Sequence, residues 1–370
     1  MRAHRPAARS RAIVVAFCWG VGVTAVSACA RGSVGAPAPS PATAAARSTT
    51  VSDSARVYSL LATLAADSME GRMTGERGSA IAARFISKEM LRIGLAPAGD
   101  SGFFQRVPMF RVRRGEGARA RWIPALAESW AALDSVPVDR RLDGVNVVGV
   151  LRGADPVLRD EAILVDAHYD HLGIRQPVGG DSIYNGADDD ASGTIAVLEI
   201  ARAIASGPRP RRTIVFLATT GEEVGLLGTR WYIRQPAHPL ERTVANLEIE
   251  MIGRPDSLAG GRGRAWLTGY ERSTMGEALA RAGIPIVADA RPDEDFFMRS
   301  DNIAFAMLGI PAHTLSSFNL HGDYHRPSDE VTAVDAGHMA QVIGAAVRAV
   351  RLLADGAKPE WKPGGRPARQ

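Results

Sequence analysis

The sequence predicts an α/β protein in which a mostly parallel central sheet has helices on both faces. Short apolar runs suited to buried strands recur along the chain, and segments with apolar residues at helical spacing separate them. Strands that alternate with helices in this way favour a parallel sheet, because each helix carries the chain back across the sheet. The composition, 46% hydrophobic and 23% charged, is that of an ordinary globular protein.

The first elements are helical. Apolar residues at helical spacing predict helices within 53–67 and 76–95, and Gly94 is a suitable stop for the second. The more polar stretch 102–143 is expected to form a hairpin, irregular structure or a small insertion.

The alternation of strands and helices begins after that stretch. Three apolar runs, 162–168, 212–220 and 245–253, predict buried strands. Further strands are expected at 264–269, 283–290 and 309–317, and helices at 192–207, 224–235, 272–283, 301–309 and 335–355. Together these elements predict a single domain over 51–357.

Both ends of the chain are expected to lie outside the domain. Residues 1–28 join a basic start to an apolar stretch, which is typical of a secretory signal peptide. The stretch ends in Val26-Ser27-Ala28-Cys29, similar to a bacterial lipobox, so Cys29 would carry lipid after cleavage; the alternative is an ordinary signal peptide. Residues 29–50 are expected to form a flexible tether, and 358–370 a disordered tail.

The net charge argues against a nucleic-acid partner. The whole chain carries +4, but the first 28 residues contain four arginines and no acid. Subtracting these four from the 44 Lys and Arg leaves 40, equal to the 40 Asp and Glu, so the processed chain has a net charge near zero. We expect an exported protein of the bacterial periplasm, a membrane-anchored lipoprotein or an extracellular protein, with membrane contact only through lipid on Cys29.

Acids and histidines gather where the predicted strands end, which is where open α/β sheets bind ligands. His168 and Asp170 end the first strand, and Asp188, Asp189 and Asp190 stand together before the next helix. The alternative explanations are a structural histidine and a helix N-terminal cap.

The later strands repeat the pattern. Glu222 and Glu223 follow the second strand, Glu250 lies near the end of the third, and His325 follows the last. Unpaired charges in a buried core cost several kcal/mol each, so such a collection needs a positive partner. Imidazoles and carboxylates that converge on one edge suit zinc, and a divalent cation would relieve the repulsion within the aspartate triplet.

Six motifs in this order resemble the co-catalytic di-zinc aminopeptidase family, over roughly 142–335 and more weakly from residue 51. That family includes secreted bacterial leucyl aminopeptidases, glutamate carboxypeptidases and glutaminyl cyclases. The motifs are AHYDHLG, YNGADDDASGT, TTGEEVGLLG, EIEMIG, RSDNIAFAMLGIPA and DYHRPSDE. The resemblance implies a zinc exopeptidase (phosphorylase/hydrolase-like) architecture.

The resemblance also implies roles for the residues at the strand ends. Asp189 would bridge two zinc ions, with His168 and Glu250 completing one site and Glu223 and His325 the other.

Two further residues receive supporting roles from the resemblance. Glu222 would be the general base, and Asp170 would orient His168. The bond between Asp189 and Asp190 would be a cis peptide.

The chain departs from the family pattern at several positions. Glu250 stands where many members have Asp, and remains competent as a ligand. Phe297 lies about where some members place a tyrosine near the oxyanion, so it is a candidate for contact with substrate, and Asn302 lies where a histidine is common. Arg299 and Arg254 are candidates for binding a substrate carboxylate; the alternative is that they form salt bridges with nearby acids.

The function implied is that of a zinc-dependent exopeptidase acting on peptides. The simplest form is an aminopeptidase that uses metal-activated water, with Glu222 as the base. A carboxypeptidase would use the same metal residues. Two further candidate functions are an acyltransferase of the glutaminyl cyclase type, which works with one zinc, and a non-catalytic binding module.

Overall fold

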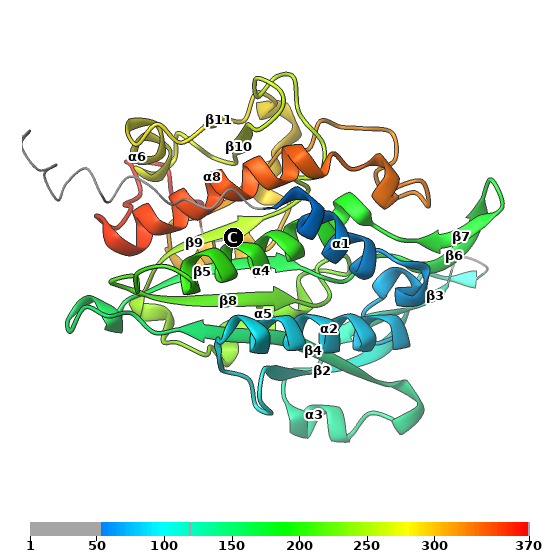
Figure 1. Cartoon of the computed structure of the whole chain (residues 1–370). Coiled ribbons are helices and arrows are strands. Elements are labelled where there is room, and N and C mark those ends of the chain that lie inside the picture. The colour runs from blue at the N-terminus through cyan, green and yellow to red at the C-terminus, as the bar shows by residue number, and fades with distance from the viewer. Residues whose placement is uncertain (1–52, 118–119, 369–370) are drawn as a thin grey trace, which may run out of the picture. The chain divides into compact units, whose positions relative to one another are not determined.

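Figure 1 shows a computed structural model of the chain, in which residues 53–117 and 120–368 are described. The predicted signal peptide, the tether and Cys29 lie outside the described residues. None of the helices in the described part of the chain combines the length and apolar character that crossing a bilayer requires.

A ten-stranded sheet forms the centre of the described domain, in the order β11-β10-β12-β9-β5-β8-β4-β2-β3, with β1 paired to β4. Its strands are β1 (Ala96–Pro97), β2 (Phe104–Arg114), β3 (Arg121–Leu126), β4 (Arg141–Leu151), β5 (Ala162–His168), β8 (Thr213–Thr219), β9 (Thr243–Ile249), β10 (Ala265–Leu267), β11 (Ile286–Ala288) and β12 (Ala312–Ser316). A separate hairpin joins β6 (Gly173–Val178) to β7 (Asp181–Tyr184).

The sheet is parallel at its centre. Strands β12, β9, β5 and β8 run parallel to one another, whereas β10 and β4, on either side of them, run antiparallel to their neighbours β12 and β8. The α/β class predicted from the sequence is confirmed. The antiparallel pairing of β2 with β3 follows from the short connection between them, because parallel strands need a longer crossover.

The stretch 102–143 does form a hairpin, and that hairpin extends the main sheet. Strand β2 pairs with β3 on one side and with β4 on the other. Strand β4 has no counterpart among the predicted elements. Its apolar residues are interrupted by Asp143, Gly144 and Asn146, which obscures the strand pattern in the sequence.

Helices cover both faces of the sheet, as predicted. Alternate residues of β5 explain this: Ile163 and Val165 pack into one core cluster, and Ala162 and Leu164 into another on the opposite face. The first cluster includes α1 (Ser54–Leu64), α2 (Arg77–Ile93), α4 (Gly193–Ala205), α6 (Met275–Arg281) and α8 (Ala336–Asp355); the second includes α5 (Leu227–Arg234) and α7 (Asn302–Leu308). The short α3 (Trp130–Asp134) lies next to β2.

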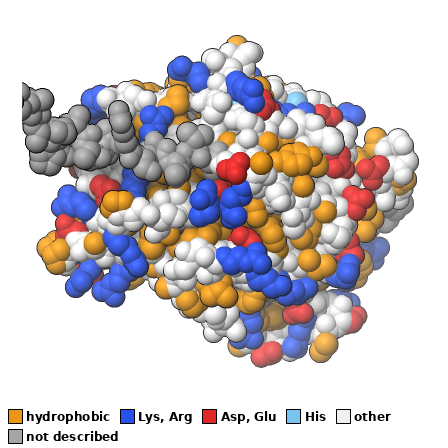
Figure 2. Space-filling view, viewed as in Figure 1, with side chains coloured by type: hydrophobic (Ala, Val, Ile, Leu, Met, Phe, Trp, Pro, Cys, Tyr) orange, Lys and Arg blue, Asp and Glu red, His pale blue; other side chains and the backbone are white. Residues whose placement is uncertain are grey.

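In front of the sheet in Figure 1, helix α4 is buried along most of its length, and the outer helices α1, α2 and α8 are amphipathic. Val57 and Leu61 of α1 are fully buried, whereas the outer surface of these helices carries basic, acidic and apolar side chains interspersed (Figure 2). Helix α2 ends at Gly94 in the left-handed conformation, with φ 84°, which confirms the predicted stop.

The C-terminal segment corrects a prediction. Residues 358–370 are expected to be disordered, but the described residues 358–368 pack against the domain. The indole Nε1 of Trp361 donates to the main-chain oxygen of Gly309 at 2.9 Å, and its ring meets Phe297 edge-on with 6.4 Å between centroids. One large aromatic residue anchors the segment, which its Gly- and Pro-rich composition does not reveal.

Candidate metal centre

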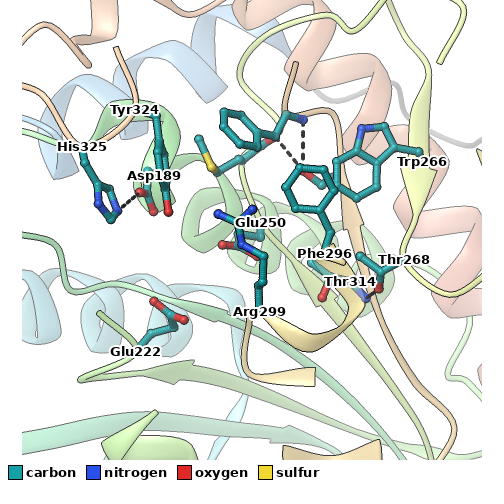
Figure 3. A pocket seen from close by; sticks show the side chains of 13 residues that line it. Asp189, Glu222, Glu250, Trp266, Thr268, Phe296, Arg299, Thr314, Tyr324 and His325 are labelled. Carbon is teal, nitrogen blue, oxygen red and sulfur yellow. Dashed lines mark hydrogen bonds and ion pairs between the residues drawn. The ribbon is translucent and has the colours of Figure 1, made fainter. Parts of the chain in front are cut away.

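The structure brings the five predicted ligands together at the carboxyl end of the parallel strands. His168 is the last residue of β5, and Glu250 directly follows β9. Asp189 lies in the π-helical turn Ala187–Ser192 before α4, Glu223 follows β8, and His325 lies in the loop after β12. Because β5, β8 and β9 are adjacent and parallel, their ends place these side chains side by side (Figure 3 shows Asp189, Glu250 and His325).

The first group of donors consists of His168, Asp189 and Glu250. His168 Nε2 lies 3.4 Å from Asp189 Oδ1 and 3.9 Å from Glu250 Oε1. One donor atom from each of the three residues lies within 4.8 Å of the others, which is close enough for a shared cation.

The second group uses the other oxygen of Asp189. Asp189 Oδ2 lies 3.1 Å from His325 Nε2, which is itself 3.2 Å from Glu223 Oε2. Asp189 therefore offers one carboxylate oxygen to each group, as expected of a bridging ligand.

His171 forms a group with Asp189 and Glu223 whose donor atoms lie within 4.8 Å of one another, and the sequence-based assignment missed it; His325 lies beside Asp189 and Glu223 but outside that group. The Nδ1 of His171 lies 2.8 Å from Glu223 Oε1 and 3.8 Å from Asp189 Oδ2, and its side chain is fully buried. The signal in the sequence is the second histidine of AHYDHLG, three residues after His168.

The donor set fits a divalent cation. Among the described residues, the ion pairs of Asp189, Glu222, Glu223 and Glu250 are with imidazoles only. The buried atoms His168 Nε2, Asp189 Oδ2, Glu223 Oε1 and both ring nitrogens of His171 have no hydrogen-bond partner. Buried polar atoms normally have partners, and this mixture of imidazole and carboxylate is what zinc prefers.

Burial and repulsion between neighbouring carboxylates also shift pKa values at the centre. Burial, reinforced by Glu248, raises the pKa of Glu250 to about 8. Burial alone would lower the pKa of His168, but Asp189 and Glu222 outweigh it and raise that pKa well above its usual range. Neighbouring carboxylates contribute to both shifts, and a bound cation would offset this buried negative charge.

Asp170 holds His168 in an orientation that suits metal binding, through its main chain. The main-chain oxygen of Asp170 lies 3.2 Å from His168 Nδ1, so Nδ1 carries the proton and Nε2 presents its lone pair to the donor group. The Asp170 carboxylate is 3.9 Å from the same nitrogen and instead accepts from the main-chain N–H of Glu222 at 3.2 Å. The orienting role predicted for Asp170 thus falls mainly to its carbonyl.

Glu222 lies beside both donor groups without belonging to either. Its Oε2 is 3.9 Å from His168 Nε2, and its side chain lines a pocket (Figure 3). Burial raises the pKa of Glu222 well above its usual range. A carboxylate whose pKa is raised is suited to accept and return a proton.

Asp188 and Asp190, on either side of Asp189, connect its turn to neighbouring segments through hydrogen bonds. Asp190 Oδ1 accepts from the main-chain N–H groups of Gly193 and Met251, both at 2.9 Å, so it caps α4 and also binds the segment after β9. Asp188 Oδ1 accepts from the N–H of Gly253 at 2.7 Å. The peptide bond between Asp189 and Asp190 is cis, as the resemblance implies.

A second layer fixes the main chain of the triplet. The carboxylate of Asp329 accepts from the N–H of Asp188 at 3.1 Å and from that of Asp189 at 3.0 Å. Arg254 pairs with Asp323 at 2.6 Å and with Asp329 at 3.4 Å. Arg254 therefore has the salt-bridge role that was the alternative to binding substrate.

Arg72 is a fully buried guanidinium behind the centre that binds only main-chain oxygens. It donates to Tyr169 at 2.7 Å, to Asn185 at 2.5 Å, to Gly186 at 2.9 Å and to Leu64 at 3.1 Å. Burial lowers the pKa of Arg72 to about 10, so the group stays charged at neutral pH. Arg72 therefore fixes the loop that carries His168 relative to the loop that carries Asp189.

A pocket opens directly beside the donor groups (Figure 3). Trp266 and Phe296 stack in its wall with 5.1 Å between centroids, and Tyr324 stacks on His325 at 3.9 Å. Its lining comprises Asp189, Glu222, Glu250, Met251, Trp266, Thr268, Phe296, Arg299, Thr314, Ser316, Phe318, Tyr324 and His325.

Of the substrate candidates Arg299 and Phe297, the structure places only Arg299 at the pocket. Arg299 lies 3.5 Å from Glu294 and stacks over Phe296 at 5.0 Å. The assignment of Phe297 is wrong, because its ring is buried against His313 and Trp361, away from the pocket. Its neighbour Phe296 lines the pocket instead, since adjacent residues of this short helical turn point in different directions.

This fold, with imidazole and carboxylate donors at the carboxyl ends of its parallel strands, is that of a metal-dependent hydrolase. The chain belongs to peptidase family M28, whose model matches residues 146–350. The resemblance stated from the motifs is thereby confirmed.

Curated relatives match part of the chain. A vacuolar membrane protease of Aspergillus clavatus is 28% identical over 205 residues, covering 54% of this chain and 19% of that protein. A probable zinc metalloprotease of Pyricularia oryzae is 33% identical over 166 residues, covering 40% of this chain and 32% of that protein. The chain thus spans a third or less of the length of these relatives.

Solved structures share the fold over most of the chain. A zinc aminopeptidase from Bacillus subtilis has a TM-score of 0.60 at 18% identity, covering 86% of this chain and 98% of that one. An aminopeptidase from Aneurinibacillus sp. strain AM-1 has a TM-score of 0.58 at 16% identity, covering 85% and 97%. A Porphyromonas gingivalis glutaminyl cyclase has a TM-score of 0.55 at 15% identity, covering 81% and 98%. At these identities the likeness establishes the fold alone.

Replacing Arg72 tests its role in holding the two ligand loops. Arg72→Met removes a donor from four buried main-chain oxygens, of which that of Gly186 keeps a second donor, the N–H of Ala191, so we expect a loss of at least about 3 kcal/mol in the free energy of unfolding and weaker zinc binding. Urea unfolding and zinc content measure the two effects. The control is Arg77→Met, nearby in sequence but exposed and paired only with Glu70. Unchanged stability and zinc content in Arg72→Met would show that the contacts are dispensable.

Proposed function

We propose that the protein is an aminopeptidase that uses two zinc ions to remove N-terminal residues from peptides. The observation that carries the proposal is the carboxylate of Asp189, which offers one oxygen to each of two donor groups beside a pocket lined by Glu222. His168 and Glu250 would complete the first zinc site, and Glu223 and His325 the second.

The chain's own residues account for proton transfer. Zinc, when bound, supplies Lewis-acid chemistry that polarises a carbonyl and lowers the pKa of a water towards about 7. Glu222 takes the proton of the attacking water and returns it to the amine that leaves. Burial raises the pKa of Glu222, which supports a role in accepting and returning a proton.

The charge at the pocket supports recognition of an N-terminus. With Asp189 and Glu250 engaged by zinc, Glu222 is the carboxylate of the lining that remains to accept from an α-ammonium group. A carboxypeptidase needs a free cation for the C-terminal carboxylate. Arg299 is the arginine on the pocket lining, but it lies beside Glu294, 3.5 Å away, and stacks on Phe296, so its charge is already compensated.

Substitution of the proposed base separates catalysis from metal binding. Glu222→Gln keeps the shape of the side chain but cannot accept the proton, so we expect kcat to fall by about 10²–10⁴-fold with zinc content unchanged. Chelation should abolish the wild-type activity and added zinc should restore it. The matched control is Glu241→Gln at an exposed position. Normal turnover by a zinc-loaded Glu222→Gln protein contradicts the assignment of the base.

Peptides blocked at either end identify which end is trimmed. We expect release of N-terminal residues from C-amidated peptides, no cleavage of N-acetylated ones, and little change in KM for Arg299→Ala. Mass spectrometry of the digest and steady-state kinetics measure these outcomes. Release from the C-terminus, with loss of affinity in Arg299→Ala, would instead indicate a carboxypeptidase. Pyroglutamate formed from N-terminal Gln, with one zinc per chain, would indicate a glutaminyl cyclase.

We also propose that the protein is exported and anchored by lipid on Cys29. Support comes from the lipobox-like Val26-Ser27-Ala28-Cys29 and the Pro- and Ala-rich stretch that follows it. Several curated relatives are named as vacuolar membrane proteases, a name that places those proteins at a membrane.

Labelling with palmitate in a bacterial host tests the anchor. The wild type should take up label and fractionate with membranes, whereas Cys29→Ser should do neither. Cys18→Ser is the control, because Cys18 lies within the apolar part of the predicted signal peptide. Absence of label from the wild type would favour an ordinary signal peptide.

A further inference from the structure

We infer that the C-terminal segment 358–368 positions the wall of the pocket formed by Thr268, Phe296 and Thr314, and that Trp361 is the residue through which it acts. Trp361 lies outside the pocket lining and outside the donor groups, so it is a positioning residue and not a catalytic one. The inference rests on the proposed function in one respect, since it takes the pocket to receive the N-terminal side chain of a peptide.

This wall is built from three separate segments. Thr268 follows β10, Thr314 belongs to β12, and Phe296 lies in the short turn Phe296–Met298; Figure 3 shows the three next to one another. The two threonines are joined directly. The N–H of Thr314 donates to Thr268 Oγ1 at 2.8 Å, and the N–H of Thr268 donates to the main-chain oxygen of Thr314 at 2.9 Å. The shape of the wall therefore depends on what holds Thr268 and the turn from behind.

His313 holds Thr268. The His313 side chain is fully buried, and burial lowers its pKa to about 4, so the imidazole is neutral at pH 7. Because a carbonyl oxygen can only accept, Nδ1 carries the proton and donates to the main-chain oxygen of Thr268 at 2.8 Å. Nε2 then accepts from the hydroxyl of Ser273 at 2.7 Å. The imidazole thus connects Thr268 to Ser273, which lies outside the pocket lining.

Phe297 holds the turn that carries Phe296. The ring of Phe297 is buried beside the guanidinium of Arg272, which lies 4.4 Å from its centroid, and beside the imidazole of His313, with 5.9 Å between centroids. Since Phe296 and Phe297 are adjacent in the chain, a shift of the buried ring also moves the ring that faces the pocket.

Trp361 packs against both of these supporting residues. Its ring lies 5.6 Å from that of His313 and 6.4 Å from that of Phe297, measured between centroids. Its Nε1 donates to the main-chain oxygen of Gly309 at 2.9 Å, which fixes the position of the indole. A single side chain of the C-terminal segment therefore contacts the residues that hold Thr268 and Phe296.

The main chain of the segment is fixed without the help of the Trp361 ring. Residues 360–362 pair antiparallel with 272–274 through two main-chain hydrogen bonds of 2.9 Å. Lys362 Nζ also binds the carboxylate of Glu277 at 2.5 Å. These contacts remain when the ring is removed, so a substitution of Trp361 alone tests what the ring does.

Steady-state kinetics on two peptides that differ only in their N-terminal residue, phenylalanine or alanine, give the first test. In Trp361→Ala we expect KM for the phenylalanine peptide to rise at least about 10-fold with little change in kcat, because its side chain reaches the wall. Both constants for the alanine peptide should stay close to those of the wild type. Trp361→Phe keeps a ring against His313 and should recover most of the lost affinity.

The control is Trp122→Ala, which removes a half-exposed tryptophan from β3, at the edge of the sheet opposite β10 and β12. It should leave the kinetics of both peptides unchanged. Packing that only stabilises the fold lowers the amount of active enzyme, which reduces the turnover of both peptides equally and leaves KM as it was. That outcome in Trp361→Ala, or no change with either peptide, would overturn the inference.

Amide hydrogen exchange of the full chain, read by mass spectrometry, gives a second test that needs no activity. In Trp361→Ala we expect faster exchange in 266–269, 296–299 and 312–316, and unchanged exchange in β5. Exchange that is equally fast in wild type and variant in those three segments would overturn the inference. So would faster exchange that includes β5, because the effect of Trp361 would then be on the stability of the whole domain.

The two tests separate this inference from the proposed function. If the protein hydrolyses no peptide, the aminopeptidase proposal fails and hydrogen exchange decides the role of Trp361. If both peptides are hydrolysed but KM in Trp361→Ala does not distinguish them, the inference fails while the aminopeptidase proposal stands. If Trp361→Ala does not fold, Trp361→Leu takes its place under the same criteria, since leucine keeps apolar bulk but has neither a ring nor an N–H.

Discussion

The structure depends on a concentration of buried negative charge at the carboxyl end of its central strands. Asp189, Glu223 and the neighbouring acids are held within a few ångströms of one another, and the described ion pairs of the four innermost carboxylates are with imidazoles alone. In a medium of low dielectric constant such an arrangement is unfavourable without a compensating cation. Three observations reflect this buried negative charge: the aspartate triplet, the unpartnered buried atoms, and the raised pKa values of His168 and Glu250.

Most of the polar residues around the centre serve to hold ligands and do not bind metal themselves. Asp190 and Asp188 accept from main-chain groups of the segment after β9, and Asp329 accepts from the main chain of the triplet. Arg72 performs the complementary task, donating to main-chain oxygens of both ligand loops. Because carboxylates and guanidinium bind the main chain, the loops are fixed without using the donor atoms that a metal requires.

The parallel part of the sheet decides where the chemistry lies. Strands β5, β8 and β9 end at the same edge, so the residues that follow them meet there, while antiparallel β4 and β10 on either side contribute no ligand. The pocket also indicates where a residue of the substrate would bind. Its aromatic wall of Trp266 and Phe296 lies to one side of Glu250, and Glu222 to the other, so a bound residue lies next to the proposed base.

The sequence by itself determined the fold class, the strands that carry the site and the five residues proposed as its ligands. Apolar runs and helical spacing are local properties, and the acids and histidines follow the strand ends in the order that the six motifs preserve. Strand β4 was not predicted because polar residues interrupt it, and the packing of the C-terminal segment was not predicted because it depends on a distant contact of Trp361 with Gly309. The tertiary structure alone decided that His171 lies beside Glu223, that Phe296 and not Phe297 faces the pocket, and that Arg254 and Arg299 lie beside acids. The physical reason is that the direction of a side chain and the neighbours it meets are set by packing between distant segments, which residue type and spacing do not encode.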